Sequence, residues 1–179
     1  MGWRFYFISS YHILSLVTLT THSIIAAAVT SPLAHLHPAL TFVVALASHY
    51  MSDAIPHWDY RLESIGDTEN PDRRTWSRSR NTLCRDIARF SADGLLGAGI
   101  VLLVTWPVTP REWLWAGSAI VGGSLPDFLQ GLYMARARFL KIHQRAHDFM
   151  HSDIRLGPYP AIGIPFQLAI AFAALWFLR

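Results

Sequence analysis

The segment at residues 48–60, SHYMSDAIPHWDY, constrains the fold because it joins an apolar stretch of membrane length to a cluster of ionisable side chains. Within eleven positions the cluster holds His49, Asp53, His57 and Asp59. Ionisable groups at membrane depth cost free energy and are rare there unless they serve a function. This segment is therefore a candidate site, and the question is which other residues join it.

The composition favours a membrane protein over a soluble domain. Hydrophobic residues make up 52% of the 179 residues and charged residues 15%, whereas a soluble domain carries about 25% charged residues. The net charge of +3 does not indicate nucleic acid as a partner, because the arginines lie beside apolar segments. We expect one integral-membrane domain over residues 1–179, with membrane lipids around it. The single cysteine, Cys84, excludes a disulfide within the chain and a metal site of several thiolates.

Five apolar segments predict an all-α fold, a polytopic membrane bundle of about five spans. They cover residues 5–30, 38–54, 87–106, 112–133 and 159–178. The last segment is a continuous apolar run of about 20 residues, which is the length that a bilayer core requires.

The remaining segments are more polar. Residues 56–86 are rich in Arg, Asp, Ser and Asn and predict a polar cytoplasmic loop, and residues 135–152 predict a short cytoplasmic amphipathic helix. Residues 1–19 are an N-terminal extension or anchor. The start of the chain also admits one long helix through the whole first span, a short helix over residues 20–29 after a lead-in, or a signal peptide.

The positive residues indicate an orientation. With five spans, one side of the membrane receives only Arg111 and Arg179, and the other side receives the remaining lysine and arginines. Because Lys and Arg favour cytoplasmic loops, we expect a cytoplasmic N-terminus and an extracytoplasmic C-terminus.

The ionisable residues near the spans fall largely at one level, the predicted cytoplasmic ends. His49 and Asp53 are four residues apart and share a helical face, and His143, His147 and His151 repeat at the same spacing. Imidazole and carboxylate groups bind zinc, manganese or iron, and a pair four residues apart can present two ligands to one ion. We expect a divalent metal, with zinc preferred over manganese or iron. The predicted metal ligands are His22, His49, Asp53, Asp93, Asp127 and His147.

The same residues admit a structural interpretation. A buried His–Asp pair can hold two helices together, and an interfacial helix often carries solvated histidines. Asp93 and Asp127 can cap helix ends. Pro56 disfavours helical geometry at the preceding residue, so His57 and Asp59 are expected on a turn that folds back over the site or contacts lipid headgroups.

Several motifs together resemble a known group of proteins. A Thr-His pair near the start, SHYMSDAIPHWDY, ADGLLG, GGSLPDFLQGLY and QRAHDFMH resemble small bacterial integral-membrane proteins over about residues 20–178. The chain is more distantly similar to membrane-bound metal-dependent hydrolases of the LexA-regulated inner-membrane type and, through HxxxD, to zinc-dependent phospholipase C. This resemblance implies a bacterial inner membrane protein with zinc ions bound by His and Asp and acting on phosphate esters. It implies metal ligands at His22, His49, Asp53, Asp127 and His147, with His57 or Asp59 near the same ions.

One departure concerns the late helix. The soluble phospholipases end with HxxxE, whereas this chain has HxxxH and no glutamate there. The number of metal ions and the reaction can therefore differ from those of the phospholipases.

The site residues predict a membrane-embedded, metal-dependent hydrolase of a lipid or lipid-linked phosphoester at the cytoplasmic interface. A bound metal lowers the pKa of its water to about 7 and neutralises the developing oxyanion. The general base would be Asp59 or an unligated histidine such as His57, and Arg61 or Arg145 would bind phosphate. Two alternatives remain: a metal or proton transporter, and a structural membrane protein with His–Asp contacts between helices.

Overall fold

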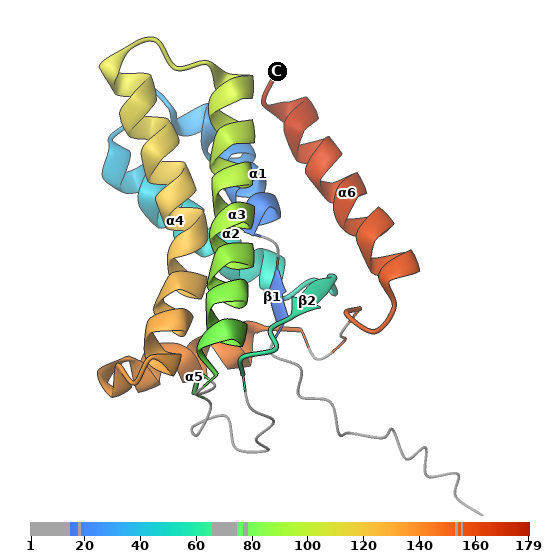
Figure 1. Ribbon diagram of the computed structural model, residues 1–179. Helices are drawn as coiled ribbons and strands as arrows, with labels where there is room; N and C mark the ends of the chain where they lie inside the picture. The colour runs from blue at the N-terminus through green and yellow to red at the C-terminus, as the bar shows by residue number, and fades with distance from the viewer. Residues whose placement is uncertain (1–14, 18, 66–74, 77–78, 153, 155) are drawn as a thin grey trace, which may run out of the picture.

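The computed structural model describes residues 15–17, 19–65, 75–76, 79–152, 154 and 156–179. Most of these residues are helical, as predicted (Figure 1). Almost all of the predicted extension or anchor over residues 1–19 lies outside the described residues.

Six α-helices and two short strands are the main elements of the described chain. The strands pair antiparallel, with Leu16 opposite Tyr60 and Val17 opposite Asp59. Prolines begin three of the helices, where the missing N–H costs no hydrogen bond. The elements are β1 (Ser15–Val17), α1 (Leu19–Thr30), α2 (Pro38–Asp53), β2 (Asp59–Arg61), α3 (Arg80–Thr105), α4 (Pro110–Met134), α5 (Lys141–Met150) and α6 (Pro160–Phe177).

The short helix α1 is the centre of the fold, because it packs against α2, α3, α4 and α6. Glycines on its neighbours allow this close approach. A Cβ added to Gly97 of α3 would lie 2.6 Å from Cα of Thr20, and one added to Gly123 of α4 would lie 2.7 Å from Cβ of Ala26. Small residues at helix contacts thus bring the backbone of α1 into the middle of the bundle.

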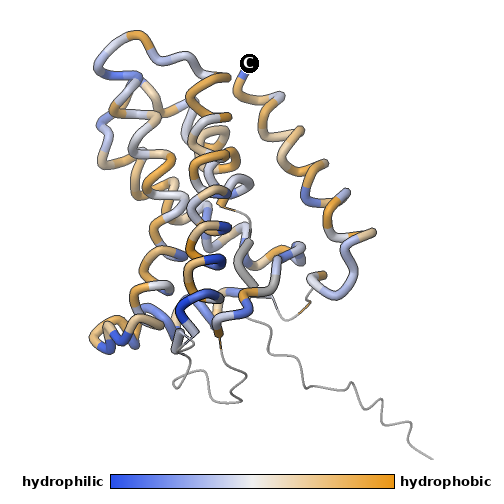
Figure 2. Tube along the Cα trace, in the orientation of Figure 1, coloured by the Kyte–Doolittle hydropathy of each residue, from blue (hydrophilic) through white to orange (hydrophobic). Residues whose placement is uncertain are grey.

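The prediction of five membrane spans is not supported. Among the described helices only α3 and α6 are long and apolar enough to cross a bilayer. α1 has 12 residues and α2 has 16, whereas a bilayer core requires about 20. α4 has 25 residues, but Pro126 and Asp127 interrupt its apolar run. Hydrophobic residues continue along most of α6 in Figure 2.

The prediction of a polar loop over residues 56–86 needs a correction, because α3 already begins at Arg80. The buried carboxylate of Asp86, in the second turn of α3, accepts hydrogen bonds from the backbone N–H and the hydroxyl of Ser64, each at 2.6 Å. This contact fixes Ser64, in the first part of the loop, to the helix. It explains how a polar, arginine-rich sequence forms the first turns of a helix that is apolar further on.

The contact of α1 with α3 gives a test of the packing. Gly97→Ala places a methyl group 2.6 Å from Cα of Thr20 and 3.1 Å from the carbonyl oxygen of Leu19. The helices must separate, so we expect the free energy of unfolding to fall by about 1–3 kcal/mol. Thermal unfolding of the detergent-solubilised protein measures this change.

Gly99→Ala is the matched control in the same helix, because no heavy atom lies within 4 Å of its added Cβ. The higher helix propensity of alanine should leave the stability unchanged or raise it by up to ~1 kcal/mol. Equal melting temperatures for the two variants would contradict the close approach of α1 and α3.

Candidate metal centre

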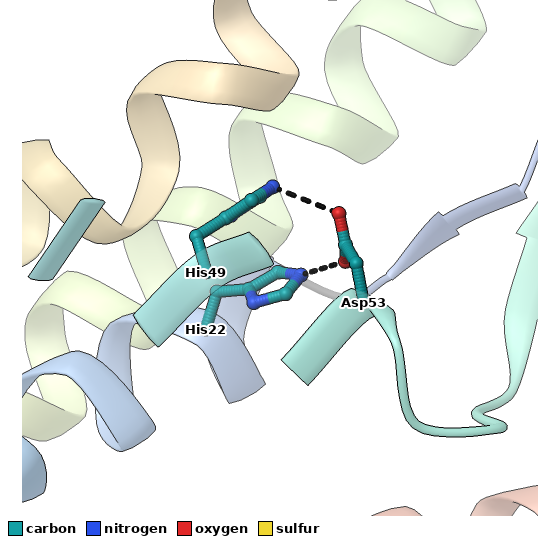
Figure 3. A group of neighbouring side chains, drawn as sticks. All are labelled: His22, His49 and Asp53. Carbon is teal, nitrogen blue, oxygen red and sulfur yellow. Dashed lines mark ion pairs between the residues drawn. The ribbon is translucent and has the colours of Figure 1, made fainter. Parts of the chain in front are cut away.

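Asp53, the last residue of α2, lies at the centre of the candidate site. Its side chain is 1% exposed, and its Oδ1 lies 3.1 Å from Nε2 of His22. Its Oδ2 lies 3.2 Å from Nε2 of His49 and 2.9 Å from Nε2 of His147. Figure 3 shows His22 and His49 pointing from α1 and α2 towards the two sides of this carboxylate. Three histidines from three helices therefore meet at one buried acid.

Asp127 of α4 adds a second carboxylate. Its Oδ1 lies 3.8 Å from Nε2 of His49 and 3.7 Å from Nε2 of His147, and these two nitrogens are 3.3 Å apart. Donor atoms of a tetrahedral zinc site, with bonds of about 2.0–2.1 Å, lie ~3.3 Å apart. We call His49, Asp53, Asp127 and His147 the inner site. His49, Asp127 and His147 form one possible ligand group, and Oδ2 of Asp53 lies within 3.2 Å of both histidine nitrogens.

The other ring nitrogen of each histidine is also held. Nδ1 of His49 donates to the carbonyl oxygen of Gly123 at 2.7 Å, and Nδ1 of His57 donates to that of Ile55 at 2.6 Å. A carbonyl oxygen can only accept, so Nδ1 carries the proton in both rings. The neutral ring then presents a lone pair at Nε2, which is the arrangement of metal-binding histidines.

Side chains hold Nδ1 of the other two histidines. The hydroxyl of Ser52 lies 2.9 Å from Nδ1 of His22 and equally far from two carbonyl oxygens of its own helix. Because its single proton is donated to those carbonyls, the hydroxyl oxygen accepts from His22. Nε2 of Gln130 lies 3.1 Å from Nδ1 of His147, while Oε1 of the same carboxamide is buried and has no hydrogen-bond partner among the described residues. Rotating the carboxamide by about 180° would turn this oxygen to the ring, satisfy it, and give His147 a lone pair at Nε2.

When the histidines are neutral, the lone pairs at their Nε2 atoms therefore face the carboxylate oxygens of Asp53 and Asp127. Nε2 of His22, both oxygens of Asp53 and Oδ2 of Asp127 are buried and have no hydrogen-bond partner in the described part of the chain. Buried polar groups without partners cost free energy. Protonating both His49 and His147 would place two positive charges 3.3 Å apart. A divalent cation would give several of these atoms a shared partner without that repulsion, so the donor set fits a metal ion.

A second group of donors lies beside the inner site. Asp53, His57 and His151 each offer a ligand atom within 4.8 Å of the others. Nε2 of His57 lies 3.1 Å from Oδ1 of Asp59. The pairing of Val17 with Asp59 in the two strands holds this segment against the start of α1. The turn after α2 thus brings His57 and Asp59 back to the site.

Two histidines outside the inner site have shifted pKa values. Burial lowers the pKa of His57, but the carboxylate of Asp59, the carbonyl of Ile55 and the charge of Asp53 together raise it above its usual value. Burial lowers the pKa of His143, which lies 3.1 Å from the hydroxyl of Tyr50. The surroundings of His57 therefore favour a positive charge beside Asp59, which either a proton or a bound cation can supply, whereas those of His143 disfavour a protonated ring.

The structure corrects the prediction that Asp93 is a metal ligand. Its Oδ2 accepts from the backbone N–H of Leu19 at 2.6 Å, and its Oδ1 accepts from the backbone N–H and the hydroxyl of Thr20. These groups form the first turn of α1, where backbone N–H groups lack partners within the helix. Asp93 caps α1 from the neighbouring helix α3.

The prediction that Arg145 binds phosphate in the site is also corrected. Gln144 and His147 of α5 are buried, whereas Arg145 is exposed on the other side of the helix. Residues two apart on an α-helix point in nearly opposite directions. The side chain of Arg61, the other arginine considered, lies outside what the structure describes.

Three residues near the histidines escaped the sequence-based prediction of ligands and their supports: Ser52, Gln130 and the carbonyl of Gly123. Gln130 had a usable signal, because it follows Asp127 by three residues and is a polar group on the same face of an apolar helix. The carbonyl of Gly123 gave no such signal, because every residue has a backbone carbonyl group.

Comparison of the chain with protein-family models, with curated proteins and with solved structures gave no match. The resemblance to membrane-bound hydrolases and to zinc-dependent phospholipase C therefore stays a prediction. The geometry of the site alone supports the function proposed next.

Proposed function

We propose that this protein is a metal-dependent hydrolase of phosphoesters, with its site at a membrane interface. The observation that carries the proposal is the buried Asp53 carboxylate, which faces three imidazole nitrogens at 2.9–3.2 Å with no hydrogen bond to its oxygens among the described residues. Nitrogen and carboxylate donors in this number suit zinc, and they also accept manganese or iron. A divalent ion here would supply a Lewis acid and a water of lowered pKa.

Asp59 is the candidate general base. Both of its carboxylate oxygens are buried and have no hydrogen-bond partner in the described structure. They lie at the edge of the site, beside His57, so Asp59 is free to accept a proton. His57 is held in orientation by the carbonyl oxygen of Ile55. Asp59 would thus accept the proton, while the hydrogen bond to Ile55 keeps the ring of His57 in place.

The surface of α5 supports a location at the membrane. Its buried face carries His147, whereas Ile142, Ala146 and Phe149 lie on the opposite, exposed face. The exposed fractions of Ile142 and Phe149 are 84% and 85%, and that of the preceding Phe139 is 83%. An apolar face flanked by basic residues is typical of helices that lie in the headgroup region. We therefore propose a lipid or lipid-linked phosphoester as the substrate.

The arrangement of α6 supports the proposed orientation. It begins near the α5 end of the bundle and ends at the far end, where the C-terminus lies (Figure 1). Basic residues near the start of α3 and in α5 mark the other end, which the positive-inside tendency assigns to the cytoplasm. A cytoplasmic site and an extracytoplasmic C-terminus in an inner membrane follow from this assignment.

The core beyond the site favours hydrolysis over ion transport. A transport path would continue the chain of polar groups through the bundle. The buried cluster that includes Ile24, Ala27, Val101 and Ala119 is instead apolar. The donor atoms gather at one end of α1, as expected for a site that acts on a substrate from one side.

Metal content is the first test of this function. Asp53→Asn keeps the size of the side chain but removes the charge that faces three histidines, so we expect the detergent-purified variant to lose its bound divalent metal. Elemental analysis by mass spectrometry measures the loss. The wild-type protein should bind metal, and a chelator should lower its melting temperature.

Asp93→Asn is the matched control, because Asp93 caps α1 and lies outside the donor groups of the described residues. It should retain the metal while losing about 1 kcal/mol of stability with the cap. A wild-type protein that binds no divalent metal would refute the proposed function and favour the structural alternative.

Hydrolysis is the second test. We expect the metal-loaded protein to hydrolyse a phospholipid phosphoester in vesicles, and Asp59→Asn to lower kcat by about 10²–10⁴-fold because the proton acceptor is lost. Glu63→Gln is the control, since Glu63 belongs to the same segment but pairs with the exposed Arg85. If the metal-loaded protein cleaves neither phospholipids nor small phosphodiesters, the assignment as a phosphoester hydrolase is wrong.

A further inference from the structure

We propose that the site holds two metal ions, bridged by Asp53, with the second ion bound by His57 and His151. This inference rests on the proposed metal-dependent function. It adds His151 as a ligand and specifies that the number of ions is two.

His49 can be a ligand of only one metal ion. Two possible ligand groups share it: His22 and Asp53 on one side, and Asp127 and His147 on the other. Nδ1 of His49 is bonded to a carbonyl oxygen, so only one lone pair, at Nε2, is available to a metal. His49 therefore serves one ion. The short distances to His147 and Asp53 place that ion in the inner site.

The two carboxylate oxygens of Asp53 face different histidines. Oδ2 faces His49 and His147, and Oδ1 faces His22. Neither oxygen has a hydrogen-bond partner within the described structure. A carboxylate with both oxygens available can bridge two ions, which lie about 3.5–4 Å apart in two-metal hydrolases. One oxygen of Asp53 thus remains for a second ion.

His151 lies beside His57, just after the end of α5. The spacing of the histidines predicts it on the same helical face as His147, but α5 ends at Met150 and His151 has an extended backbone. Its ring lies 4.8 Å from the ring of His57. The next residue, Ser152, donates its N–H to the carbonyl oxygen of Asp53 at 2.8 Å. The end of α5 is therefore fixed against the end of α2, with His151 beside His57.

The second metal position lies among Asp53, His57 and His151. Nε2 of His57 is buried and has no hydrogen-bond partner among the residues described. Its Nδ1 is held by a carbonyl oxygen, so its lone pair points to Asp59 and to the space shared with Asp53 and His151. With three protein donors, from Asp53, His57 and His151, a tetrahedral ion here would keep one open position for water or a substrate oxygen.

The charges agree with two ions. Two divalent cations carry four positive charges, and Asp53, Asp59 and Asp127 carry three negative charges when ionised. One phosphoester anion would bring the sum to zero, so the doubly loaded site matches the substrate class proposed above. A single ion would leave this acidic site negative and repel a phosphate.

The experiment measures metal per chain in the detergent-solubilised, full-length protein. We expect two ions in the wild type and one in His151→Gln, because the inner site does not include His151. His57→Gln should also retain one ion, and it provides a second variant should His151→Gln fail to fold. With manganese loaded, the wild type should give the electron paramagnetic resonance spectrum of a spin-coupled pair, and both variants the spectrum of an isolated ion.

His143→Gln is the matched control. His143 stands four residues before His147, as His151 stands four after it, but it lies 3.1 Å from the hydroxyl of Tyr50 and outside the donor groups of the described residues. The variant should retain two ions and the spin-coupled spectrum. One ion per wild-type chain, unchanged by His151→Gln, would overturn the second position and leave the proposed function standing. No ion in the wild type would instead overturn the proposed function itself.

Discussion

The buried Asp53 carboxylate is the group on which the arrangement of this protein depends. Its oxygens face imidazole nitrogens from α1, α2 and α5, and Asp127 of α4 lies close to two of the same nitrogens. A buried acid without compensating positive charge would cost several kcal/mol. The helices meet at this end around buried donors that could hold a metal ion.

Packing and electrostatics meet at one residue, Gly123. The lack of a side chain lets α1 approach α4, which brings His22 towards Asp53. The carbonyl of the same residue accepts from His49 and sets which nitrogen of that ring carries the proton. The close contact of two helices and the protonation of a candidate ligand therefore have one cause.

The helix α5 connects the site to the surface. It contributes His147 to the inner site through its buried face and exposes Ile142 and Phe149 on the opposite face. A short helix with these two faces can lie at the level of lipid headgroups while it closes the site from below. In the sequence, this amphipathic helix lies between α3 and α6, the two described helices that are long and apolar enough to cross a bilayer.

The sequence alone determined the contacts that depend on local spacing. His49 and Asp53 share a helical face because they are four residues apart, and Pro56 keeps His57 off that helix. Only the tertiary structure decided the role of Asp93, because the helix that it caps is distant in the chain. It also decided that α1, a helix of 12 residues, lies at the centre of the bundle, since glycines on its neighbours let it approach closely. Helical periodicity acts within a segment, whereas caps and close backbone approaches depend on partners that the local sequence does not contain.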